Sequence, residues 1–169
     1  MAGRGLWRSH ERRWRLTGNG TWELEFYQDE NGREPCRSWI QDLGREKRLA
    51  IETALEHVLA VRGLDVVETE FGKALGKGLY EFRLRWTAKE VAEKVGAVLA
   101  ETPAESESIL LRVFFCTAGR KIVLLLSGYD KGADASGRRQ DAEIARARKY
   151  LKAWLEAEKK AKATRRRNG

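Results

Sequence analysis

The chain has 169 residues, enough for one ordinary domain, and 42% of them are hydrophobic, which excludes a chain that is disordered throughout. Its formal net charge is +8, but the excess is concentrated at the two ends. Residues 1–20 hold five arginines against one glutamate, and residues 156–169 hold six basic residues against two glutamates. The stretch between them is neutral overall, so the total charge does not by itself indicate a nucleic-acid-binding domain.

The apolar pattern and the cysteines bound the protein further. The longest apolar run, residues 122–126, has the length of a strand and is far too short to span a membrane. No apolar segment follows the N-terminal arginines, so we expect no secretory signal and a cytoplasmic protein with no membrane partner. Cys36 and Cys116 match neither a disulfide framework nor a zinc spacing. Because phosphate-binding glycine motifs are also absent from the sequence, we expect no cofactor and no metal ion.

The first half of the chain predicts a strand, two helices and a loop. Residues 21–27 alternate apolar and polar side chains, which is typical of a strand with one buried face. A helix is expected from Pro35 to Gly44, and a longer one over residues 45–62, packed together as an antiparallel hairpin. Residues 71–78 are punctuated by glycines and predict a loop.

The second half predicts three strands and a final helix. Residues 79–86 alternate with period two, and residues 109–116 and 120–127 are joined by a hairpin turn. The last helix is expected from Arg139 to near Lys159. The order βααβββα predicts an α+β fold with a curved antiparallel four-stranded sheet, packed against an N-terminal helical hairpin and a C-terminal helix.

The expected domain covers residues 21–155, between a basic N-terminal arm (1–20) and a basic C-terminal tail (156–169). Residues 87–108 are longer than the tight turn that would join two neighbouring strands. Their first part, residues 88–100, has helical periodicity, whereas residues 102–106 have the composition of a loop. We therefore expect an inserted helix or a flexible flap in this segment.

Several motifs occur in a defined order along this domain. They read GLYEFRLRW (78–86), LLRVFFC (110–116), KIVLLLSGYDK (121–131) and EIARARKYL (143–151), and the upstream helix reads REPCRSWIQDL (33–43). Together they resemble the HigB-like, phage-derived branch of the RelE/ParE superfamily, the toxins of type II toxin–antitoxin systems. The resemblance covers roughly residues 21–155, and each motif is weak alone.

The resemblance implies a small endoribonuclease, an mRNA interferase that is usually ribosome-dependent, cleaves mRNA in the decoding site and so inhibits translation. It also implies a cognate antitoxin that neutralises the toxin and is often a helix-turn-helix protein. Operator DNA would then be bound only through the toxin–antitoxin complex. Metal-independent cleavage of RNA through its own 2′-hydroxyl requires a base, cations that stabilise the phosphorane, and an acid for the leaving oxygen.

Matched to the family motifs, Arg83 and Arg112 are expected to bind the phosphate, with Lys131 as a third cation or proton donor. Glu81 is either the general base or the partner that holds the two arginines, and we favour the second role. Further contacts to RNA are expected from Lys73, Lys77, Arg85, Tyr129, Arg138 and Arg139. Gly132 stands where the family has its second lysine, which leaves the catalytic set open.

Other interpretations fit the same residues. By its pattern alone, the strand face with Glu81, Arg83 and Arg85 is a solvated face, and Lys73 and Lys77 are lysines of an exposed loop. Within the same fold, a ParE-like inhibitor of DNA gyrase needs no catalytic cluster. A third possibility is a non-enzymatic module whose basic arms hold nucleic acid.

Overall fold

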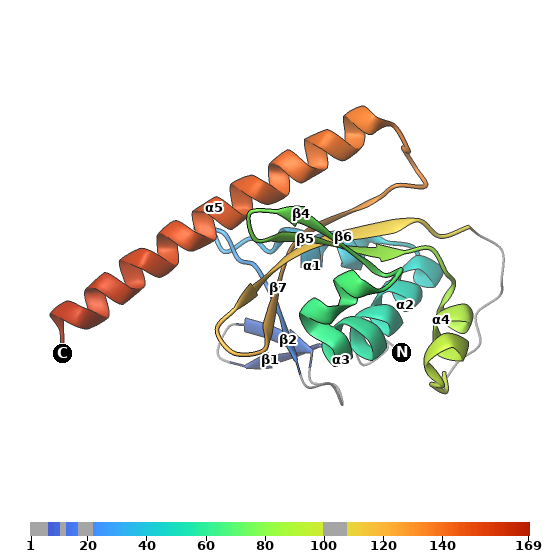
Figure 1. Cartoon of the computed structure of the whole chain (residues 1–169), viewed down its shortest axis with the longest axis horizontal. Helices are drawn as coiled ribbons and strands as arrows, with labels where there is room; N and C mark the ends of the chain where they lie inside the picture. The colour runs from blue at the N-terminus through green and yellow to red at the C-terminus, as the bar shows by residue number, and fades with distance from the viewer. Residues whose placement is uncertain (1–6, 11–12, 17–21, 100–107) are drawn as a thin grey trace.

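The computed structural model describes residues 7–10, 13–16, 22–99 and 108–169. The fold is α+β, as expected: one mixed sheet carries four helices on one face and a single long helix on the other (Figure 1). The order of strands across the sheet is β1-β2-β3-β7-β6-β5-β4. The strands are β1 (Trp7–His10), β2 (Arg13–Leu16), β3 (Glu23–Phe26), β4 (Gly72–Gly76), β5 (Leu79–Leu84), β6 (Leu111–Ala118) and β7 (Ile122–Asp130).

The helices are close to those that the sequence predicts. They are α1 (Pro35–Asp42), α2 (Arg45–Ala54), α3 (Ala60–Arg62), α4 (Ala88–Val95) and α5 (Gly137–Arg167). The expected helix over residues 45–62 is confirmed, with one π-helical turn, Leu55–Leu59, between α2 and α3. A 3-10 helix, Gly63–Glu68, follows it and leads to β4.

The prediction of a four-stranded antiparallel sheet is wrong in two respects. The described strands number seven, and β3 pairs with β7 in parallel, with Leu24 beside Val123 and Phe26 beside Leu125. Short turns join the antiparallel pairs β4–β5 and β6–β7, whereas β5 and β6 pair antiparallel across the long connection that contains α4. No short connection links β3 to β7, so local pattern does not determine the direction of β3.

Residues 71–78 are not the loop that their glycines predict. Gly72 to Gly76 form the edge strand β4, which pairs antiparallel with β5 and places Lys73 opposite Glu81. The glycine at position 72 is required by close packing, because a Cβ there would lie 2.5 Å from the Val66 carbonyl oxygen. Lys77 occupies the turn to β5 with a φ of 54°.

The inserted segment contains the expected helix, in a shorter form. Thr87 caps α4 by accepting a hydrogen bond from the Glu90 N–H, while the Glu90 side chain accepts one from the Thr87 N–H. The helix ends at Val95 because Gly96 takes a left-handed conformation. The predicted loop at residues 102–106 lies outside the described residues.

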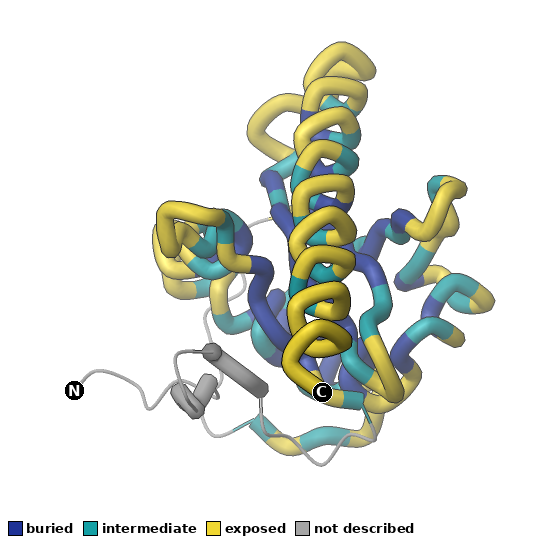
Figure 2. The backbone as a smooth tube through the Cα atoms, turned by 90° about the vertical axis from the view of Figure 1, so that its left-hand side faces the viewer, coloured by how far each residue is buried: buried dark blue, intermediate teal, exposed yellow. Residues whose placement is uncertain are grey.

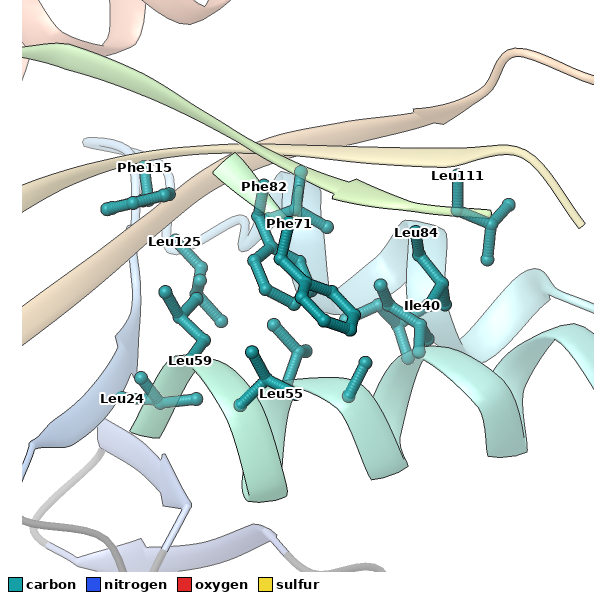
Figure 3. Packing of buried hydrophobic residues seen from close by; sticks show 14 of the residues in the cluster. Leu24, Ile40, Leu55, Leu59, Phe71, Phe82, Leu84, Leu111, Phe115 and Leu125 are labelled. Atoms are coloured by element: carbon teal, nitrogen blue, oxygen red, sulfur yellow. The ribbon is translucent and has the colours of Figure 1, made fainter. Parts of the chain in front are cut away.

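One face of the sheet is closed by α1, α2, α3 and α4 over an apolar core. Phe82, Leu84 and Leu111 of the sheet meet Leu55 and other helical side chains there (Figure 3). The phenyl rings of Phe71 and Phe82 stack with centroids 6.0 Å apart. This layer contains the larger share of the buried apolar side chains, and it holds the sheet in place beneath the candidate site.

The other face of the sheet is covered by α5 alone (Figures 1 and 2). Ala147 and Leu151 of α5 pack on Leu79, Phe114 and Leu126. Arg148 fastens the helix to the edge strand, since its guanidinium donates hydrogen bonds to the Leu75 and Gly76 carbonyl oxygens at 2.8 and 3.3 Å.

The last helix is longer at its C-terminal end than the sequence predicts. It continues to Arg167 rather than ending near Lys159, so the described residues of the expected basic tail are mostly helical. The basic arm at residues 1–20 contributes β1 and β2, which extend the sheet beside β3. None of the helices in the described ranges combines the length and apolar character that a bilayer span requires.

Candidate functional site

The central strands bring together residues that are far apart in the sequence. Arg83 of β5 lies opposite Arg112 of β6, and Arg112 lies opposite Tyr129 of β7. Glu81 is two residues before Arg83 and therefore lies on the same face of the pleated strand. This face is the one that α5 covers, so the three predicted residues Glu81, Arg83 and Arg112 lie in one cluster, with Tyr129 beside it.

Glu81 joins the two arginines. Its carboxylate is fully buried; Oε1 accepts a hydrogen bond from Arg83 Nε at 2.7 Å and lies 3.8 Å from Arg112 Nε. A carboxylate buried in this way requires cationic partners, because an unpaired buried charge is strongly destabilising. Its other oxygen, Oε2, has no hydrogen-bond partner among the described residues. The geometry is that of a group that orients two guanidinium groups.

Arg112 is the deeper of the two arginines. Its side chain is 5% exposed, against 23% for that of Arg83, and Nη1 donates a hydrogen bond to the Leu111 carbonyl oxygen at 3.1 Å. Burial lowers the pKa of the Arg112 guanidinium and the neighbouring Arg83 lowers it further, while Glu81 acts in the opposite direction. An arginine remains protonated at neutral pH despite such a shift, so Arg112 contributes a buried positive charge.

Tyr129 places a hydroxyl that has no described hydrogen-bond partner beside the cluster of Glu81, Arg83 and Arg112. Its ring stacks on Phe114 with centroids 6.0 Å apart, and the guanidinium carbon of Arg139 lies 5.8 Å from the ring centroid. Burial raises the pKa of the Tyr129 hydroxyl, and the nearby Glu81 raises it further. The hydroxyl has no hydrogen-bond partner among the described residues, and neither has the buried hydroxyl of Ser127. Both are neutral groups that can donate a proton or a hydrogen bond.

Helix α5 adds a second buried carboxylate, which the sequence analysis missed. Glu143 is 2% exposed; its Oε1 accepts a hydrogen bond from Arg139 Nε at 2.9 Å and lies 3.5 Å from Arg146 Nη1. Its Oε2 has no partner in the part of the chain that the structure describes. A signal was present in the sequence, because Glu143 precedes Ala147 and Leu151 at intervals of four and so continues the buried stripe of the helix.

Of the remaining predicted residues, all but Arg139 lie outside this cluster. Lys131 follows the end of β7, where its backbone N–H donates to the Leu110 carbonyl oxygen, and no described hydrogen bond or ion pair joins its ammonium group to Glu81 or Glu143. Arg85 and Arg138 are exposed. Lys73 is exposed beside Glu81, and Lys77 lies in the turn beyond it. Arg139 alone among the outlying predicted RNA contacts touches the cluster, through Glu143 and Tyr129.

The cluster has an excess of positive charge, and its arginines differ in how far they are exposed. Its four arginines exceed its two glutamates, and the more exposed arginines are Arg83, Arg139 and Arg146. Planar guanidinium groups bind phosphate through paired hydrogen bonds, which makes an anion the ligand that this rim fits best. Within the described ranges no group of three or more histidine, cysteine or acidic side chains is arranged to hold a metal ion.

Comparison with known proteins adds no relative to this picture. No family model matches the chain, and no curated protein is significantly similar to it.

Proposed function

We propose that the chain is the toxin of a type II toxin–antitoxin system, a HigB-like protein of the RelE/ParE superfamily that cleaves translated mRNA on the ribosome. The observation that carries this proposal is the buried ion-pair cluster of Glu81, Arg83 and Arg112. These are the residues that the family resemblance singles out, and they meet across two adjacent strands. An amphipathic strand with a merely solvated face would not bury Glu81 completely.

The residues of the cluster supply what metal-independent RNA cleavage requires. Arg83 of the sheet, together with Arg139 and Arg146 of α5, binds the scissile phosphate and stabilises the charge that develops as the 2′-oxygen attacks. The buried Arg112 adds to the positive electrostatic potential at the position of the phosphate. We assign Glu81 to holding both arginines in place, because each of them lies near the same carboxylate oxygen.

Two groups at the site have unused hydrogen-bonding capacity of the right kind for proton transfer. Glu143 Oε2 can accept the proton of the 2′-hydroxyl, and the Tyr129 hydroxyl can donate one to the leaving 5′-oxygen. The Tyr129 hydroxyl is protonated at neutral pH, as the acid must be, although burial raises its pKa and so makes it a weaker proton donor than an exposed tyrosine. Glu143 belongs to the second turn of α5 and Tyr129 is buried in the layer under this helix, so we expect the first turns of α5 to shift when RNA binds.

The partners follow from the same proposal. The cognate antitoxin, expected to be a helix-turn-helix protein, would neutralise the toxin, and operator DNA would be bound only by the complex of the two. We expect the product of a neighbouring reading frame to restore growth to cells that express this chain and to copurify with it.

The decisive experiment compares induced expression of the wild type with Arg83→Gln and Arg112→Gln. We expect growth arrest and new 5′ ends in translated mRNA, mapped by primer extension, with the wild type, and a loss of at least about tenfold in cleavage with each variant. Arg120→Gln removes the same charge from the exposed turn between β6 and β7 and should behave as the wild type. Thermal unfolding of each purified variant separates loss of the site from loss of the fold.

Wild-type growth arrest without new 5′ ends, accompanied by induction of DNA damage, would reject RNA cleavage in favour of gyrase inhibition. A non-enzymatic nucleic-acid module is the second candidate, and the exposed basic half of α5 favours it. In that case Arg83→Gln and Arg112→Gln would keep full activity, whereas removal of basic residues from the far end of α5 would abolish it.

A further inference from the structure

The C-terminal half of α5 leaves the domain and has no role in the site described above. Buried positions of α5 end at Leu151, and Trp154 is the last large side chain that packs on the sheet. Residues 155–169 are all described, and none of them is buried. The helix nevertheless continues to Arg167, so its last turns project beyond the edge of the sheet (Figures 1 and 2).

This projecting segment is strongly basic. Residues 149–167 contain eight lysines and arginines and two glutamates. Lys152, Lys159 and Arg166 follow at intervals of seven residues, which places them on one face of an α-helix, with a drift of only about 20° per interval. All three side chains are exposed, and they lie roughly 100° around the helix from the buried stripe that contains Ala147 and Leu151.

The segment keeps its helical form without a core to pack against. Glu156 precedes Lys160 by four residues, and Glu158 precedes Lys162 by four, the order that stabilises an isolated helix. Three arginines in the last turn interact favourably with the negative, C-terminal end of the helix dipole and so stabilise the helix. The helix therefore presents its cations at fixed positions from Lys149 to Arg167, 18 residue steps that span about 27 Å at 1.5 Å per residue.

The chemistry of this surface fits one kind of partner. The projecting turns have no apolar face that a lipid surface could bury; Leu155 is the one large apolar side chain there that is exposed. They also lack a cluster of asparagine, glutamine or aromatic side chains that could read bases. Long cationic side chains in a stripe match a line of phosphates, and they bind it without regard to sequence.

We infer that residues 149–167 form a second nucleic-acid contact, which binds the phosphate backbone of double-stranded RNA and lies apart from the Glu81 cluster. The choice of RNA over DNA rests on the proposed function. An A-form duplex has a major groove too narrow for an α-helix, so the helix lies along the phosphates. A toxin that cleaves mRNA on the ribosome, which is built largely of folded RNA, gains from such a contact. The contact raises the concentration of the toxin near its substrate.

The test measures binding of the full-length protein to a 20-base-pair RNA duplex by fluorescence anisotropy at several salt concentrations. The variant Lys152→Gln/Lys159→Gln/Arg166→Gln keeps good helix formers at exposed positions, so its fold should be unchanged. Each phosphate contact contributes about 0.9 to the slope of log K against log salt, so we expect the slope to fall by about 2.7 and the affinity at 0.1 M salt by at least tenfold.

The matched control is Arg48→Gln/Arg62→Gln/Lys89→Gln, which removes three exposed charges from α2, α3 and α4 on the opposite face of the sheet. A loss in this control equal to that in the α5 variant would show that net charge alone drives binding, and would overturn the inference. So would an unchanged slope in the α5 variant, or binding to a DNA duplex of the same sequence that is more than threefold tighter than to RNA.

The same variants separate this inference from the proposed function. Arg83→Gln should lose mRNA cleavage and keep nearly all of its affinity for duplex RNA, since Arg83 belongs to β5, is paired with the buried Glu81 and is not part of the basic segment of α5. If Arg83→Gln leaves toxicity unchanged, the proposed cleavage site is wrong while the α5 contact still stands on its binding data. If the α5 variant binds duplex RNA normally, the contact is wrong while the cleavage site is unaffected.

Discussion

The two faces of the sheet differ in how they are closed. The face toward α1–α4 is sealed by a broad apolar layer, in which Phe82, Leu84 and Leu111 have no exposed surface. The face toward α5 is closed by one helix, and its interior includes three buried carboxylates and a buried arginine. Burying such groups is costly, and a domain selected only for stability would fill the space with apolar side chains. The face toward α1–α4 therefore stabilises the fold, and the face toward α5 carries the candidate site.

The largest effect should come from the apolar face. Phe82→Ala removes a fully buried ring that stacks with Phe71, so we expect a loss of about 3–5 kcal/mol in the free energy of unfolding, measured by urea denaturation. Phe114→Ala makes the same change at a fully buried position under α5. It should cost less, because a single helix can settle into the space more readily than a layer of packed helices. An equal or greater loss in Phe114→Ala would contradict the contrast between the faces.

The next effect concerns the buried ion pairs. Glu81→Leu leaves Arg112 without its carboxylate, and we expect a loss of about 2–4 kcal/mol, since a buried charge that loses its partner is strongly destabilising. The double variant Glu81→Leu/Arg112→Met replaces both groups by apolar ones and should recover most of that loss. A double variant no more stable than Glu81→Leu would mean that the carboxylate acts through packing and not through charge.

The strands that carry these residues were largely predictable from local pattern. Period-two alternation in residues 79–84 places Glu81 and Arg83 on one face, and the turn at residues 117–119 fixes β6 beside β7. The pairing of β5 with β6 does not follow from these patterns, because residues 85–110 separate the two strands. The proximity of Arg112 to Glu81 and Arg83 was expected from the family resemblance, and the preferred role of Glu81 as the partner of the arginines stays a prediction.

Other features depend on interactions that local pattern does not encode. The parallel direction of β3 depends on its pairing with β7, which is distant in the sequence. Residues 72–76 form a strand, despite their glycines, because they pair with β5. Glu143 joins the site because α5 crosses the face of the sheet at this point, and helical periodicity alone gives no crossing position. The extent of α5 was missed because its last turns have no apolar stripe, the signal by which amphipathic helices are recognised.

A smaller effect on stability is expected from the hydroxyl of Tyr129. Tyr129→Phe removes a buried hydroxyl that has no partner among the described residues, so the free energy of unfolding at pH 7 should change by less than about 1 kcal/mol. Cleavage of mRNA should nevertheless fall by at least about tenfold if this hydroxyl is the acid. A large loss of stability together with unchanged cleavage would assign the hydroxyl to the fold.

The pH dependence of stability tests the same hydroxyl. Its pKa in the folded protein is raised above the ordinary value of 10.0, chiefly by burial. The unfolded chain therefore loses this proton first as the pH rises, so the contribution of Tyr129 is complete below pH 10 and declines above it until the folded pKa is passed. Denaturation measured from pH 8 to pH 11 should show a shallower alkaline decline for Tyr129→Phe than for the wild type. Parallel curves would mean that the hydroxyl ionises alike in both states.

The smallest perturbation uses the two cysteines as reporters of the two faces. Cys36 lies in the layer beneath the helices, Cys116 lies in the layer beneath α5, and neither is more than 2% exposed. Burial raises the pKa of both thiols, that of Cys116 to about 12, so neither is a thiolate in the folded protein at pH 8. A thiol reagent can therefore react only after local opening.

Because a single helix closes its face, Cys116 should be labelled faster than Cys36. The labelling is followed over time by mass spectrometry, and the variants Cys36→Ala and Cys116→Ala assign the two sites. Labelling of both thiols at one common rate would mean that the faces open only with global unfolding, and α5 could then not shift separately to admit RNA.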